Sequence, residues 1–143
     1  MGRYVVLEDV AVADCALDIE GADLADLFET AARALAELMV DPATLPTTVE
    51  RTLVLSAPRL DLLLYDFLSE LIYRKDRDQE VFTAARVRVS GAGPVQLTAE
   101  VRGGVIDYER TALRADPKAV TFHRFGAQSE TDGAWRAQVV IDI

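Results

Sequence analysis

Alternation of apolar and polar side chains predicts β-strands along much of this chain. The clearest case is 135–143, where apolar residues alternate with mostly polar ones (Trp135, Ala137, Val139 and Ile141 against Arg136, Gln138, Val140 and Asp142). If the Trp135 side faces a core, Asp142 points the other way, one residue before Ile143. Further strands are expected at 3–8, 12–19, 49–55, 80–89, 95–102 and 119–128.

Apolar residues at a three-four spacing predict two amphipathic helices. In 23–39 these residues fall on one helical face (Leu24, Leu27, Phe28, Ala31, Leu35, Leu38 and Met39). Asp23 is placed to cap the first turn of this helix. The second helix is expected to start at Ser56, with Pro58 in its first turn. It should end before the charged run 74–78, which we expect to be a solvated loop.

Two helices packed on about seven mostly antiparallel strands define an α+β fold. A length of 143 residues is enough for one domain with its own core, so we expect a single domain over 1–143. The longest segment without a regular pattern is 103–117, which opens with two glycines. A loop of this length in a compact domain is more often functional or mobile than neutral.

Acidic residues are concentrated in the first third of the chain. Residues 8–41 contain ten acidic side chains and one basic side chain, Arg33, and this difference equals the whole net charge of −9. Direct nucleic-acid binding through this segment is not expected, because phosphates need basic partners. A cation or a basic protein surface is a better candidate partner. The alternative is that these acidic side chains confer solubility and have no other role.

Cysteine content and the lack of long apolar segments indicate the cellular compartment. A single cysteine, Cys15, excludes an internal disulfide, is typical of a reducing cytoplasm, and is expected to be a small buried hydrophobic residue. No stretch approaches the roughly 18 apolar residues of a membrane span, and no signal segment opens the chain. We therefore expect a cytoplasmic protein with no membrane partner.

Carboxylates are the best candidates for a functional site. There is no Walker loop, no Gly-x-Gly-x-x-Gly motif and no paired His or Cys of a zinc site. The sole histidine, His123, has no nucleophile motif around it. Asp14 lies between apolar residues, so a buried charge there needs a partner. A metal ion shared with Asp142 would be such a partner, and calcium, magnesium or manganese would suit oxygen ligands; a nearby arginine would serve equally well.

Several blocks of the sequence resemble the archease family and occur in that family's order along essentially the whole chain. The blocks are 12–15, 23–24, 28–29, 38–41, 63–71, 118–123 and 135–143. The most specific combination is the Lys-Ala-x-Thr-x-His strand at 118–123 together with a chain that closes on Asp-Ile.

The resemblance implies a non-enzymatic accessory protein of an RtcB-type RNA ligase in tRNA splicing and RNA repair. Such a protein would promote guanylylation of the ligase and its turnover by meeting a basic ligase surface rather than RNA. The resemblance also implies a divalent cation, typically calcium, held by Asp14, Asp142 and the terminal carboxylate of Ile143. Lys118 would lie near this acidic tip. His123 and Asp41, which fall in the resembling blocks, are further candidates for contacts near the site or with the ligase.

The chain departs from the archease pattern at two positions. Ala11 stands where the family usually has the histidine of a His-Thr-Ala-Asp motif, and Thr111 stands where many members have a histidine in the long loop. Both departures remove polar groups near the site but leave its carboxylates. Two other functions stay open: a metal-dependent phosphoesterase or nucleotide hydrolase that uses Asp14 and Asp142 with His123 as base, and a protein-interaction module without metal.

Overall fold

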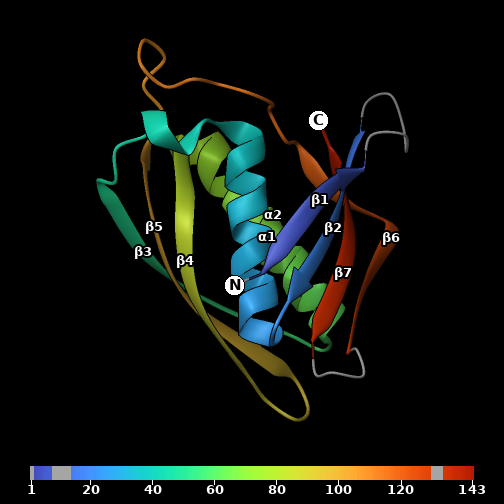
Figure 1. The fold of residues 1–143 in the computed structure, drawn as a ribbon. Helices are drawn as coiled ribbons and strands as arrows, with labels where there is room; N and C mark the ends of the chain where they lie inside the picture. Colours follow the sequence, from blue (N-terminus) through green and yellow to red (C-terminus); the bar gives the residue numbers. More distant parts are fainter. Residues whose placement is uncertain (1, 8–13, 130–133) are drawn as a thin grey trace.

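Two antiparallel sheets flank a pair of helices in the computed structural model, which describes residues 2–7, 14–129 and 134–143 (Figure 1). For Leu7, Asp14 and residues 122–129 only the backbone is described. The elements follow the order β1 (Arg3–Leu7), β2 (Asp14–Gly21), α1 (Leu24–Met39), the 3-10 helix η1 (Pro42–Thr44), β3 (Val49–Ala57), α2 (Leu60–Asp78), β4 (Glu80–Ser90), β5 (Val95–Val105), β6 (Ala119–Ser129) and β7 (Trp135–Asp142).

Within these ranges the strands form one sheet of order β1-β2-β7-β6 and a second of order β3-β5-β4. Every strand pair between them is antiparallel. The α+β fold expected from the sequence, with two helices on seven antiparallel strands, is therefore confirmed.

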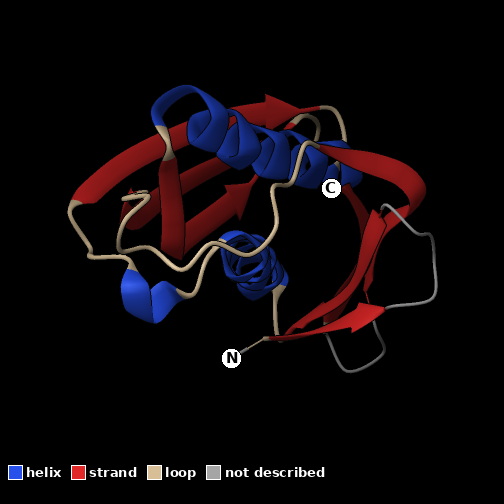
Figure 2. Ribbon diagram, turned by 90° about the horizontal axis from the view of Figure 1, so that it is seen from above, coloured by secondary structure: helices blue, strands red, loops and turns tan. Residues whose placement is uncertain are grey.

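Helix α1 lies between the two sheets, near the centre of the view from above (Figure 2). It packs along β4 on one side and β2 on the other, and α2 contacts β3, β4, β5 and β6. The rings of Phe28 and Phe67, with centroids 6.0 Å apart, join the two helices. Asp23 caps α1 as expected, because its side chain accepts a hydrogen bond from the Asp26 N–H at 2.8 Å.

Strand β7 confirms the alternation that predicted it. Ala137, Val139 and Ile141 are each at most 1% exposed. The opposite face is not simply wet, because Val140 is also buried, as is Ala16 beside it on β2. Cys15 is buried too, and desolvation raises the pKa of its thiol, as expected for an inert hydrophobic residue.

Two expected boundaries of α2 were wrong. Residues 56 and 57 are not helical but continue β3, since they pair with Gln96 and Val95 of β5. Pro58 keeps the preceding residue extended, so α2 starts only at Leu60. The charged run 74–78 is not a solvated loop but the last turns of α2, which end at Gln79 in a left-handed conformation (φ 58°).

The irregular segment also starts later than expected, because β5 extends to Val105. Gly103 belongs to that strand and permits a close approach to β4. A Cβ atom at this position would lie 1.8 Å from the Val81 carbonyl oxygen. The segment without regular structure is therefore 106–118, which we call the strap.

Candidate functional site

The ends of three strands meet beside the last residue of the chain. In the antiparallel register, Asp142 of β7 lies opposite Asp14 of β2 on one side and opposite Ala119 of β6 on the other. The Lys118 N–H also donates a hydrogen bond to the Asp142 carbonyl oxygen at 2.7 Å. We call Asp14, Lys118, Asp142 and Ile143 the acidic tip.

The structure thus brings together the backbones of four of the predicted site residues. Asp142 and Ile143 are partly buried, and Ile143 packs against the core, whereas Lys118 is exposed. The side chains of Asp14 and His123 lie outside the described residues, as does Ala11 altogether. Among the side chains that are described, no three His, Cys, Asp or Glu residues gather closely enough to hold a metal ion.

The strap is tied to the C-terminal end of α1. The last carbonyl groups of a helix have no partner inside it, and here residues of the strap supply partners. The N–H groups of Arg114 and Ala115 donate to the carbonyl oxygens of Met39 and Leu38, both at 2.8 Å. The Arg114 guanidinium donates to the Glu37 carbonyl oxygen at 2.9 Å. The strap is thus ordered by the end of α1.

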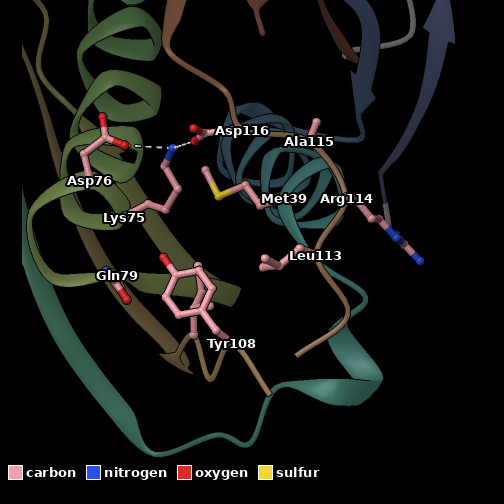
Figure 3. A pocket seen from close by; sticks show the side chains of 10 residues that line it. Met39, Lys75, Asp76, Gln79, Tyr108, Leu113, Arg114, Ala115 and Asp116 are labelled. Atoms are coloured by element: carbon pink, nitrogen blue, oxygen red, sulfur yellow. Dashed lines mark hydrogen bonds and ion pairs between the residues drawn. The ribbon is translucent and has the colours of Figure 1, made fainter. Parts of the chain in front are cut away.

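The strap is also tied to α2, through Lys75. This side chain is 8% exposed although it belongs to the charged run near the end of the helix. Its ammonium forms an ion pair with Asp116 of the strap and another with Asp76 at 2.8 Å (Figure 3). It also donates a hydrogen bond to the Pro117 carbonyl oxygen at 3.0 Å. Burial acts to lower the pKa of Lys75, but the hydrogen bonds to Asp116 and Asp76 outweigh it and raise that pKa.

Lys75 lines a pocket of about 310 Å³ between the ends of both helices and the strap (Figure 3). Met39 and Ile106 contribute apolar surface, and Tyr108 and Leu113 stand largely exposed at its edge. Sequence reasoning missed Lys75, because a lysine within a charged run is usually solvated. The available signal was its rarity, since Lys75 and Lys118 are the only lysines beside thirteen arginines.

Asp41 and Thr111 have local structural roles. The Asp41 carboxylate accepts a hydrogen bond from the Ala43 N–H at 3.1 Å and caps η1, which lies across α1 from the C-terminus in the view from above (Figure 2). Thr111 is buried, and its hydroxyl accepts a hydrogen bond from the Asp107 N–H at 2.9 Å. Thr111 thus stabilises a turn of the strap.

Most of the acid-rich segment also has structural partners. Seven of its ten acidic side chains form hydrogen bonds or ion pairs (Asp18, Glu20, Asp23, Asp26, Glu29, Glu37 and Asp41). Glu29, for example, accepts a hydrogen bond from the Val87 N–H at 2.8 Å, on the edge strand β4. These contacts leave the negative charge in place, but they explain most of the acids without a partner protein. Glu8 and Asp9 lie outside the described residues.

Fold and site together define a class: a small α+β protein with helices between two antiparallel sheets and aspartates at one shared end of its strands. The chain belongs to the archease family, since the model of the archease protein family (MTH1598/TM1083) matches residues 4–143. It is 33% identical to protein archease of Thermococcus gammatolerans over 132 residues, which cover 92% of this chain and 93% of that protein. It is 33% identical to protein archease of Methanosarcina acetivorans over 143 residues, 99% and 96% of the two chains.

Two solved structures share the fold of this chain. The solution structure of protein 1598 of Methanobacterium thermoautotrophicum matches with a TM-score of 0.77 at 29% identity, over 99% of this chain and 98% of that one. The crystal structure of an archease from Thermotoga maritima, described as a possible chaperone, matches with a TM-score of 0.64 over 96% and 97% of the chains. At 17% identity the second likeness supports the fold alone. In the described residues, no helix is long and apolar enough to span a membrane.

Proposed function

We propose that this protein is a non-catalytic activator of an RtcB-type RNA ligase in tRNA splicing and RNA repair. Membership of the archease family supports this class of function. The observation that supports the acidic tip as the site is the strand register, which sets Asp142 opposite Asp14. In this proposal the acidic tip meets the basic nucleotide site of the ligase and promotes its guanylylation and turnover.

The register fits a bound divalent cation such as calcium. Residues directly opposite on antiparallel strands have Cα atoms about 4.5–5.5 Å apart. Two like charges at such positions destabilise a sheet unless something neutralises them. The Asp142 side chain is only partly buried, so it is accessible from solvent. Carboxylate oxygens are the ligands that calcium and magnesium prefer.

Asp14, Asp142 and the Ile143 carboxylate would hold the cation, which supplies positive charge for phosphate oxygens when bound. The residues of the chain have separate tasks in this proposal. The Lys118 N–H fixes the Asp142 backbone through the 2.7 Å hydrogen bond. The exposed Lys118 side chain is available to contact phosphate. The buried side of β7 keeps the tip attached to the core.

The test is single-turnover guanylylation of the cognate ligase, with and without this protein. Acceleration by the wild type, and a loss on the order of ten-fold for Asp142→Asn, are expected. Asp18→Asn is a matched control, because Asp18 lies on the same pair of strands but binds Arg136 at 2.7 Å. No acceleration by folded wild-type protein would overturn the proposal.

The alternatives predict different results for the isolated protein. A metal-dependent phosphoesterase would turn over phosphoester substrates and stop when a chelator is added. An interaction module without metal would keep the same melting temperature with and without calcium or manganese. Either result would overturn the proposal of an activator that binds a metal at its acidic tip, and the corresponding alternative would take its place.

A further inference from the structure

We propose that Lys75 is a positioning residue for the acidic tip. Its ammonium holds Asp116 and Pro117 of the strap so that the next residue, Lys118, keeps its hydrogen bond to Asp142. The inference concerns the same site as the proposed function, and only its ligase readout rests on that function.

The path from Lys75 to the tip is short and continuous. The Lys75 ammonium donates to the Pro117 carbonyl oxygen at 3.0 Å, and that carbonyl belongs to the peptide unit shared with Lys118. The N–H of this same peptide unit donates to the Asp142 carbonyl oxygen at 2.7 Å. One peptide group is thus held from both sides, by α2 and by β7.

The strap before this peptide is held by α1 and not by the tip. Arg114 and Ala115 form backbone hydrogen bonds with the last turn of α1. Residues 116–117 form no backbone hydrogen bond with another described segment, so their hydrogen bonds come from the Lys75 side chain. Residues 116–117 therefore depend on Lys75 more than their neighbours do. Lysine suits this task, since one compact ammonium can donate to three oxygen atoms in different directions.

If Lys75 only stabilised the fold in general, its loss would affect the whole protein and not the acidic tip in particular. The Asp76 and Asp116 side chains are 58% and 78% exposed, so solvent screens their ion pairs with the buried Lys75 and limits what these pairs contribute to global stability. The hydrogen bond to the Pro117 carbonyl oxygen is the buried contact, and it acts on the tip. Loss of Lys75 should therefore loosen Lys118 locally rather than unfold the protein.

Amide hydrogen exchange of Lys118 measures this directly, with neither metal nor ligase present. For Lys75→Met we expect the protection factor of the Lys118 amide to fall by about ten-fold or more, the size of a lost charged hydrogen bond. Amides in the β3–β5 pair should keep their protection. The matched control is Arg77→Met, which removes one positive charge from the same helix end, where Arg77 pairs with Asp78 at 2.6 Å. It should leave Lys118 unchanged.

Asp116→Ala keeps the test decisive if Lys75→Met does not fold. It removes an exposed carboxylate, so folding is not threatened, and a smaller fall in Lys118 protection is expected. Unchanged Lys118 protection in a folded Lys75→Met protein, or in Asp116→Ala when that variant carries the test, overturns the inference. An equal fall at all amides also overturns it, because it would mean that Lys75 acts only on global stability.

The ligase assay separates this inference from the proposed function. If wild-type protein accelerates guanylylation, Lys75→Met should reduce the acceleration while Arg77→Met should not. Retained acceleration in Lys75→Met with loosened Lys118 would overturn the link from this positioning to ligase activation, although Lys75 would still position the tip. If the wild type gives no acceleration, the proposed function fails, while Lys118 protection still decides whether Lys75 positions the tip.

Discussion

Substitution of Asp142 by asparagine should change stability in opposite directions with and without a divalent cation. The wild type sets Asp142 opposite Asp14, and like charges at directly opposite positions cost about 0.2–1 kcal/mol. In a chelating buffer the uncharged amide removes this repulsion. Asp142→Asn should then be as stable as the wild type or more stable by up to about 1 kcal/mol. For a protein of this size that is a rise of about 2–4 °C in melting temperature.

Calcium should reverse the order of the two proteins. A ligand at 100 times its dissociation constant stabilises the folded state by about 2.7 kcal/mol. This corresponds to a rise of roughly 5–10 °C for the wild type. Asp142→Asn lacks one charged ligand and should show a much smaller rise at the same calcium concentration.

The assay is a thermal melt of both proteins in EDTA and across a calcium titration. Asp18→Asn is the control, since hydrogen bonding by Arg136 holds the pKa of the Asp18 carboxyl below its usual range. This variant should lose about 0.5 kcal/mol in both buffers and keep the full calcium response. A full calcium shift in Asp142→Asn would refute Asp142 as a ligand. If Asp142→Asn lost more than about 1 kcal/mol of stability in EDTA, the claim that Asp142 and Asp14 repel each other would be refuted.

Three further outcomes are expected. Asp23→Ala should cost about 1 kcal/mol in urea denaturation, because it removes the cap of α1; an unchanged midpoint would mean that the cap contributes nothing. Burial and the hydrogen bond to Glu37 raise the pKa of Tyr4 to about 12. In the unfolded chain the phenol ionises near pH 10. The stability that protonated Tyr4 contributes to the fold is therefore complete below pH 10 and is lost as the pH rises toward 12. Tyr4→Phe should abolish that alkaline loss in pH-dependent melts, and persistence of the loss would assign it to another group. One residue added after Ile143 would move the terminal carboxylate by about 3.3 Å and should weaken calcium binding, measured by titration calorimetry, while an added N-terminal residue should not. Equal affinities would show that this carboxylate is not a ligand.

The sequence determined the elements whose pattern is local. The period-two alternation of β7 and the three-four spacing of α1 predict most of the buried positions of these two elements, and Asp23 caps the helix where its position predicts. These features depend on residues near one another in the chain, so a linear pattern contains them. The resemblance to archease also identified the family, because its blocks are read from residue identities alone.

Tertiary structure decided what depends on distant partners. Ser56 and Ala57 became strand because β5 pairs with them, against their helix-start pattern. Lys75 became buried because the strap, some forty residues further along the chain, supplies Asp116 and the Pro117 carbonyl oxygen. The register that sets Asp142 opposite Asp14 likewise joins opposite ends of the chain. A residue's own identity does not specify which segment will pack against it, so these three contacts exist only in the folded molecule.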